Sequence, residues 1–380
     1  MLKLDRAFCT GCSACSAVCP VGAIHMETNS EGFLYPVIAD SICINCSKCE
    51  KVCPVAFSRE LLLGKTYAVQ HCSSAVLAQS ASGGAFTALS DVVLQQKGVV
   101  YGAAFDENLQ VKHIRATTYE QRDSMRGSKY VQSDMSGAYR NIATDLLENK
   151  CVLFVGTPCQ VEAVKRYCSV IRKGLLITCD LICNGVPSPL IFQEHMQLLA
   201  RKYHSKVTRY ECRPKRWGWH VHREMATLEN GRVVYDTAWS NLWREVYYRR
   251  LITRPSCYDC RFCSLERAGD ITIADCRRVE EVLSEFDTYK GVSLVMVNSE
   301  KGEALFEAAS KSCECHSIDV RKILQPPMCK PSGPSARRKD FWETYEKHGY
   351  EKAIQKTFGI TYSLKHDIKK AIARLRKKDS

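Results

Sequence analysis

The sequence predicts a small N-terminal domain of the α+β class, an α/β body after it, and a basic helical tail. Three observations predict this order: a duplicated cysteine motif within the first 60 residues, repeated strand–turn–helix patterns after them, and a lysine- and arginine-rich C-terminal stretch. A chain of 380 residues is long enough for two or three domains. We place the boundaries at 1–60, 61–205, 206–330 and 331–380, where the two middle segments are parts of one body.

The N-terminal domain contains the motif C-x2-C-x2-C-x3-C-P twice, at a constant offset of 34 residues. In this motif three closely spaced thiolates bind one 4Fe–4S cluster, and the cysteine before proline binds the other cluster. We therefore assign one cluster to Cys9, Cys12, Cys15 and Cys53, and a second to Cys43, Cys46, Cys49 and Cys19. A pair of zinc sites is the alternative, but zinc gives no reason for the closing Cys-Pro. Residues 1 to about 57 resemble bacterial two-cluster ferredoxins, which carry single electrons between partners.

The body begins with the stretch ASGGAFTALSDVVLQQKG, followed by the apolar run VVYGAAF. We expect a helix capped by Ser82 and stopped by Gly98, and then a strand. The Ser-Gly-Gly turn at 82–84 leaves backbone N–H groups open to a phosphate, although an ordinary helix cap explains the turn equally well. Two later stretches, CVLFVGTPCQVEAVKRY and GLLITCDLICNGVPSPLIFQEH, each predict a buried strand, a cap at Thr157 or Ser188, and a helix.

Five further cysteines suggest a third metal site. Cys159 and Cys183 each lie just beyond the carboxyl end of an expected strand, which is the edge where open α/β sheets bind ligands. The stretch RPSCYDCRFCS has three more cysteines but no closing Cys-Pro. We expect Cys159, Cys183, Cys257 and Cys260 to hold a third 4Fe–4S cluster. The alternatives are that Cys263 replaces one of the two remote thiols, or that the site is a structural zinc; Cys276, after the strand pattern GDITIAD, stays unassigned.

Six motifs follow one another along the body: SGG at 82–84, GSKYVQS at 127–133, GTPCQ at 156–160, DLICNGVPSP at 180–189, RPKRWGW at 213–219, and RPSCYDC with GDITIAD. In this order they resemble the β subunit of coenzyme F420-reducing hydrogenases and formate dehydrogenases, over most of residues 1–330. The resemblance implies a flavin-binding body that holds FAD and iron–sulfur clusters and moves hydride at the flavin. Asn184 stands where the family has histidine, and residues 275–278 also depart from the family pattern, so the substrate does not carry over.

The resemblance also implies a set of FAD contacts: Ser82, Gly83, Gly84, Gly127, Ser128, Lys129, Tyr130 and Gln132. Lys129 is a point charge for phosphate, Gly127 permits close approach of the backbone, and Tyr130 can stack on a ring. A surface turn is the alternative for GSKYVQS. No catalytic proton donor is assigned, since His71, His113, His195 and His220 are candidates by chemistry alone.

These features predict an iron–sulfur flavoprotein oxidoreductase. Low-potential electrons would pass between the N-terminal clusters and FAD by way of the third cluster, and hydride would move to or from a small molecule. That molecule is expected to be a deazaflavin (coenzyme F420) or a precursor of cell-envelope polysaccharide. The redox partner is expected to be a ferredoxin or another oxidoreductase subunit. The alternatives are an electron-transfer subunit without its own substrate and a metal-stabilised binding protein of glycan machinery.

The formal net charge of +13 does not require nucleic acid as a partner. Bound clusters and FAD are anionic and offset much of this excess. The tail SLKHDIKKAIARLRKKDS can form a basic amphipathic helix on an anionic membrane, or simply a solvated helix. The 22 cysteines are clustered rather than paired, and the start has no apolar segment of signal-peptide length, so we expect a cytoplasmic protein.

Overall fold

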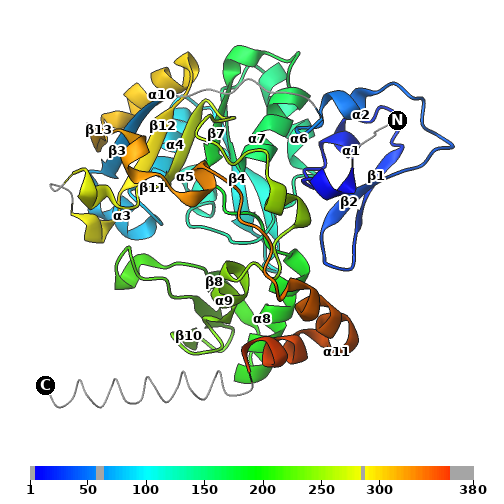
Figure 1. Ribbon diagram of the computed structural model, residues 1–380. Coiled ribbons are helices and arrows are strands. Elements are labelled where there is room, and N and C mark those ends of the chain that lie inside the picture. The colour runs from blue at the N-terminus through cyan, green and yellow to red at the C-terminus, as the bar shows by residue number, and fades with distance from the viewer. Residues whose placement is uncertain (1–4, 57–63, 284–286, 360–380) are drawn as a thin grey trace, which may run out of the picture.

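The computed structural model describes residues 5–56, 64–283 and 287–359. Figure 1 shows three parts: a small N-terminal head, a large α/β body beside it, and a lobe that hangs below the body. The expected fold class, with a ferredoxin-like head and an α/β body, is confirmed. None of the helices in the described ranges combines the length and the apolar character that a membrane span requires.

The head consists of a two-stranded antiparallel sheet and two short helices, whose bounds are β1 (Ile24–Thr28), β2 (Leu34–Ile38), α1 (Ala14–Val18) and α2 (Lys48–Lys51). The sequence duplication recurs in the backbone. Gly11 and Ser13 before α1 have φ of 64°, and Asn45 and Ser47 before α2 have φ of 51° and 56°. The same left-handed turns therefore open both cysteine motifs.

The body is built on an eight-stranded sheet with the order β13-β3-β12-β11-β7-β6-β4-β5. The strands are β3 (Lys65–His71), β4 (Val99–Phe105), β5 (Val111–Ala116), β6 (Val152–Gly156), β7 (Leu176–Leu181), β11 (Ile271–Asp275), β12 (Ser293–Val297) and β13 (Cys313–Ser317). The central strands β4, β6, β7 and β11 run parallel. Their carboxyl ends therefore meet at one edge of the sheet, where ligands bind in such folds.

Helices cover both faces of this sheet. Their bounds are α3 (Ser74–Gln79), α4 (Ala85–Gln95), α5 (Tyr119–Asp123), α6 (Ala138–Leu147), α7 (Pro158–Tyr167) and α10 (Glu300–Ser310). Helices α4 and α10 pack together over one apolar core, while α6 and α7 share a second core with the head. The expected cap of α7 at Thr157 is confirmed as a capping box with Gln160.

The expected cap of α4 at Ser82 is wrong. The helix begins after Gly84, which has φ of 87°, and the Ser82 hydroxyl donates to the carbonyl oxygen of Val292 at 2.8 Å. The Ser82 side chain, which the local pattern assigned to the helix cap, is thus hydrogen-bonded to Val292, the residue before β12.

The lobe combines a three-stranded sheet with three helices: β8 (Val207–Glu211), β9 (Met225–Leu228), β10 (Val233–Tyr235), α8 (Pro189–Tyr203), α9 (Leu242–Tyr248) and α11 (Arg338–Phe358). The expected cap of α8 at Ser188 is confirmed. Phe192, Trp243 and Phe341 fill the core of the lobe. Helix α11 is kinked at Gly349 and packs against the core of the lobe. The basic stretch from residue 363 onward lies outside the described residues.

Candidate redox site

The eight cysteines of the head form two groups. Cys19, Cys43, Cys46 and Cys49 line a small pocket at the outer end of the head. Cys46 is exposed there, and the flanking Ile42 and Ile44 are 50% and 59% exposed. The second group, Cys9, Cys12, Cys15 and Cys53, lies deeper, since Cys9 and Cys53 are buried, and we call it the inner group. Burial, and then the neighbouring thiols of Cys12, Cys9 and Cys53, raise the pKa of the Cys15 thiol. The crossed assignment of these eight thiols to two clusters stays a prediction, and the shared pocket of Cys19, Cys43, Cys46 and Cys49 is compatible with it.

The inner group lies against the body. Tyr139 of α6 donates to the Cys12 carbonyl oxygen at 2.8 Å, and the Arg254 Nε donates to the Cys9 carbonyl oxygen at 2.7 Å. Cys53 belongs to the same apolar core as Phe262 of the body. The inner group therefore faces the body, and the outer group faces solvent.

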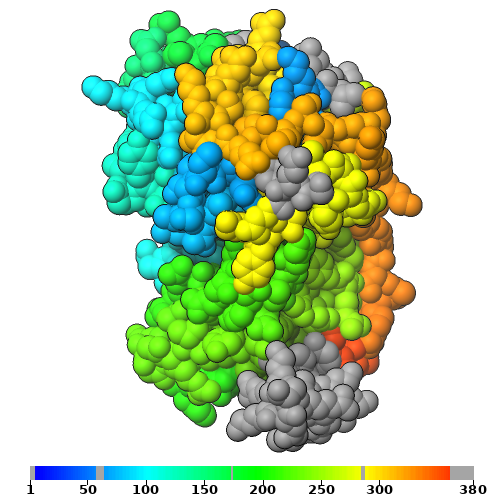
Figure 2. Space-filling model, turned by 90° about the vertical axis from the view of Figure 1, so that its left-hand side faces the viewer, coloured from blue at the N-terminus to red at the C-terminus, as the bar shows by residue number. Residues whose placement is uncertain are grey.

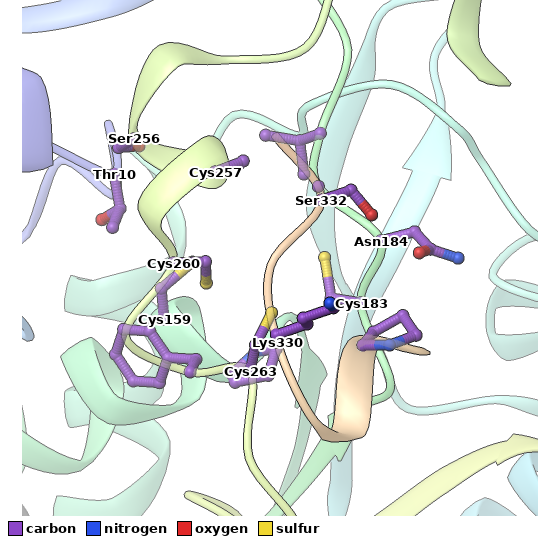
Figure 3. A pocket seen from close by; sticks show the side chains of 15 residues that line it. Thr10, Cys159, Cys183, Asn184, Ser256, Cys257, Cys260, Cys263, Lys330 and Ser332 are labelled. Atoms are coloured by element: carbon purple, nitrogen blue, oxygen red, sulfur yellow. The ribbon is translucent and has the colours of Figure 1, made fainter. Parts of the chain in front are cut away.

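Five cysteines of the body line one cavity, which Figure 3 shows from close by. They are Cys159, Cys183, Cys257, Cys260 and Cys263. Cys159, in the first turn of α7, and Cys183 follow the ends of the neighbouring parallel strands β6 and β7. Cys257 lies in the 3-10 helix η4 (Pro255–Asp259), and Cys260 and Cys263 follow it. Thr10, between two cysteines of the inner group, lines the same cavity. Cys276 does not, because it is buried in the apolar core around Trp219.

The donor set of this cavity suits an iron–sulfur cluster. Burial, and then neighbouring thiols, raise the pKa of Cys257 to about 11 and of Cys183 to about 12. Such thiols ionise only beside positive charge, which a bound metal supplies. No group of three His, Cys, Asp or Glu side chains in the described ranges is placed to hold a single metal ion. That finding does not bear on a cluster, because each of its thiolates binds a different iron atom.

A strap of chain crosses the five-cysteine cavity. Pro327, Lys330 and Ser332, which follow Gln325, line the cavity, and Lys330 lies near Cys183 and Cys263 in Figure 3. The strap is held in place by Gln325, whose Nε2 donates to the Asp275 carbonyl oxygen at 2.7 Å, and by Arg250, which donates to Ser332 at 3.2 Å. Lys330 is the one cation among the lining residues described.

A second cavity, of about 320 Å³, adjoins the first. Six of the eight residues expected to contact FAD line it: Ser82, Gly84, Gly127, Ser128, Lys129 and Tyr130. Gly83 and Gln132 do not. The N–H of Gly83 donates to Ser293 Oγ at 2.9 Å, and Gln132 Nε2 donates to the Thr10 carbonyl oxygen at 3.0 Å. Gly83 instead permits close packing, since a Cβ atom there would lie 2.2 Å from the Val69 carbonyl oxygen.

The lining of this second cavity is suited to a dinucleotide. Residues Gly84 to Thr87 place the start of α4 on the cavity, and first-turn N–H groups have no intrahelical acceptor. Lys129 adds a cation at the same wall. The Nε2 of the cavity-lining His113 donates to Val155 at 3.1 Å, which leaves its Nδ1 as an acceptor without a partner among the described residues. A group with both phosphate and ring donors matches these features.

Aromatic residues form another wall of this cavity. Tyr130 and Tyr247 stack with ring centroids 5.3 Å apart, and Tyr248 follows at 5.3 Å from Tyr247. Sequence reasoning did not identify the two tyrosines of α9, which carry no motif signal. Among the candidate histidines only His113 lines the cavity; burial lowers the pKa of His195, which lies in the core of the lobe, to about 3.

The two cavities share a wall made of residues 183–186. Gly185, with φ of 89°, allows this wall to be thin, because a Cβ atom at that position would lie 2.8 Å from Thr253 and 3.1 Å from the Cys257 Cβ. The inner thiols of the head, the five-cysteine cavity and the second cavity therefore follow one another in space.

Two families of known proteins match parts of the chain. Residues 149–321 match the C terminus of the beta subunit of coenzyme F420 hydrogenase/dehydrogenase, and residues 8–57 match the 4Fe-4S dicluster domain. Among solved structures, a chain of the xenon-derivatised F420-reducing NiFe hydrogenase complex from Methanosarcina barkeri is similar, with 18% identity and a TM-score of 0.47. That match covers 80% of this chain and 97% of the other. No curated protein matches the chain.

Proposed function

We propose that the chain is an iron–sulfur flavoprotein oxidoreductase, because residues 8–57 match a 4Fe-4S dicluster domain and residues 149–321 match the C terminus of the coenzyme F420 hydrogenase/dehydrogenase beta subunit. FAD, when bound, would exchange single electrons with the clusters and a hydride with a substrate. The substrate we propose is a deazaflavin (coenzyme F420) or a precursor of cell-envelope polysaccharide. The electron partner is a ferredoxin or another oxidoreductase subunit.

One observation carries this proposal: the five-cysteine cavity has Thr10 of the head on one side and shares residues 183–186 with the second cavity on the other. A cluster in the first cavity would lie between the inner group of the head and a flavin in the second. Residues from three parts of the sequence place the inner group, the five-cysteine cavity and the second cavity one after another. A metal site with a purely structural role does not need such a succession.

Each part of the chain has its own task in this scheme. The outer thiols of the head, with exposed Ile42 and Ile44 beside them, are where a partner protein docks. The start of α4 and Lys129 would hold the diphosphate of a bound FAD, and the stacked Tyr130 and Tyr247 would offer aromatic contacts to it. Gly185 keeps the wall between the third cluster and the ring thin.

Anaerobic reconstitution with iron, sulfide and FAD tests the proposal. The expected content is about twelve irons, from three clusters of four, and one FAD per chain. Eight irons without flavin would contradict the proposal and leave only an electron-carrying head. Cys183→Ser and Cys263→Ser, with the buried Cys276→Ser as control, then decide which four of the five thiols hold the third cluster: the serine variant that loses four irons identifies a ligand.

A further inference from the structure

A third and larger cavity, of about 1000 Å³, opens beside the second cavity, which we call the flavin cavity because we propose that it binds FAD. Five segments of the sequence line this third cavity: residues 74–81 around α3, residues 105–109, residues 123–129, residues 208–216 after the start of β8, and Tyr289 with Lys290. The first, fourth and last of these lie next to one another on the face drawn in Figure 2, in blue, green and yellow. We refer to this cavity as the basic groove.

The basic groove is continuous with the flavin cavity. Ser80, Ala81 and residues 126–129 line both. A molecule that lies in the groove therefore reaches the flavin cavity without crossing the protein.

Positive charge dominates the lining of the basic groove. Besides Arg213, which pairs with Asp275 at 2.5 Å, the cations that line it are Arg126, Lys129, Arg209, Lys215, Arg216 and Lys290. Of the three carboxylates in the lining, Asp123 and Glu211 pair with Arg126 and Arg209 of the groove, at 3.0 and 3.4 Å, and Asp106 pairs with Lys112 outside it, at 2.8 Å. These three carboxylates therefore do not neutralise all of the positive charge in the basic groove.

Three of these cations have no carboxylate partner within the described ranges. Lys129 donates to the carbonyl oxygens of Ser124 and Arg126, both at 2.9 Å, and Lys215 to three carbonyl oxygens at 2.5 to 2.8 Å. Arg216 is exposed and rests on the Trp217 ring at 5.6 Å. Burial lowers the pKa of Lys129 to about 7 and of Lys215 to about 8, because the charged ammonium group is less stable away from water. A bound anion would stabilise the charged form of both lysines.

We propose that the basic groove binds the phosphate-bearing part of an anionic substrate, whose reactive end enters the flavin cavity through the shared wall. This inference rests on the proposed function and gives its substrate a chemical class: a phosphate or diphosphate ester. Guanidinium and ammonium groups are the side chains that recognise such anions. The same chemistry occurs in the adenylate half of FAD, so the experiment must separate these two sources.

Arg216 and Arg223 provide a matched pair for that experiment. Both guanidinium groups stack on the Trp217 ring, at 5.6 and 5.3 Å, but only Arg216 lines the basic groove. The probe is inorganic pyrophosphate, titrated calorimetrically into the anaerobically reconstituted, FAD-loaded full chain. We expect binding to the wild type that weakens as salt rises, about tenfold weaker binding to Arg216→Gln, and unchanged binding to Arg223→Gln. FAD content should be equal in all three proteins.

Two results would overturn the inference. Pyrophosphate that binds the flavin-free chain but not the FAD-loaded chain, or an Arg216→Gln protein that no longer retains FAD, would assign the groove to the cofactor itself. Equal pyrophosphate affinity of Arg216→Gln and wild type would exclude the groove as the anion site. If the wild type takes up no FAD at all, the proposed function fails separately, and the same comparison on the flavin-free chain still decides whether the groove binds phosphate.

Discussion

Arg254 joins the head to the body through Cys9: its Nε donates a 2.7 Å hydrogen bond to the carbonyl oxygen of this expected cluster ligand. The rest of the guanidinium donates to Leu34 of the head at 2.9 Å and to Gln132 at 3.1 Å, and it stacks over Tyr35 at 4.4 Å. The side chain is completely buried and, in the described part of the chain, has no carboxylate partner. A buried cation next to the inner thiols compensates the negative charge that a cluster brings.

Replacing Arg254 should therefore weaken the attachment of the head. Arg254→Gln leaves the buried carbonyl oxygens of Cys9 and Leu34 without a donor, and each such loss costs roughly 1–3 kcal/mol. We expect faster limited proteolysis between head and body and a lower reduction potential of the inner cluster. The control is Arg261→Gln, which removes an exposed arginine that also donates to the head, at Val55. Equal effects of both substitutions would contradict the special role of Arg254.

Lys330 should raise the reduction potential of the proposed third cluster. Its ammonium group lies at the five-cysteine cavity, and a reduced cluster carries one more negative charge than an oxidised one, so the lysine favours reduction. Lys330→Gln is expected to lower the reduction potential of that cluster, by about 59 mV if the equilibrium changes tenfold. Redox titration followed by electron paramagnetic resonance measures this shift. Lys322→Gln changes an exposed lysine outside the cavity and should leave the potential unchanged; a potential that is also unchanged in Lys330→Gln would refute the prediction.

The sequence predicted those features that depend on residues close together in the chain. The cysteine groups of the head follow from ligand spacing, and the caps at Thr157 and Ser188 follow from the backbone needs of a helix start. The roles expected of Ser82 and Gln132 differ from the contacts that these residues make in the structure, and tertiary packing is the cause. Ser82 binds Val292, and Gln132 bridges to the head, because distant segments fold against them.

The same limit applies to the residues that the sequence did not single out. Arg254 is the first residue of the RPSCYDC motif, but its contacts depend on the position of the head, which the motif does not encode. The basic groove is lined by five segments that have no common pattern in the sequence. Only tertiary packing brings these groups together, so spacing within the chain contains no signal for them.

Binding of FAD should take up a proton through Lys129. Burial lowers the pKa of this lysine to about 7, so it is mostly neutral at pH 8 in the flavin-free protein. A bound diphosphate favours the charged form, so the pKa rises on binding and the affinity should fall as the pH increases from 7 to 9, by up to about tenfold per unit. Calorimetry in buffers of different ionisation enthalpy counts the proton. Lys129→Met should bind FAD more weakly and without the proton uptake, whereas an unchanged uptake in this variant would assign the proton to another group.

Glu224 should make the lobe less stable as the pH rises from about 4.5 to about 8. Its carboxyl group is completely buried near Tyr210, accepts a 2.9 Å hydrogen bond from the Arg244 backbone N–H, and has a pKa raised by burial to about 8. The unfolded chain loses this proton near pH 4.5, whereas the folded chain keeps it until about pH 8. The folded state thus binds more protons between these values, and the free energy of unfolding should decrease by about 1.4 kcal/mol per pH unit as the pH rises through this window.

The substitution Glu224→Gln isolates this contribution, because glutamine keeps the acceptor for the Arg244 N–H and cannot ionise. Chemical unfolding of the full chain at pH 6, 7 and 8 should show a shallower fall in stability for the variant than for the wild type. Above pH 8 the wild-type carboxylate is charged in both states, so the difference between the two proteins should level off. Parallel stability curves from pH 6 to 8 would mean that Glu224 is already ionised in the folded lobe, with its charge neutralised by Arg244.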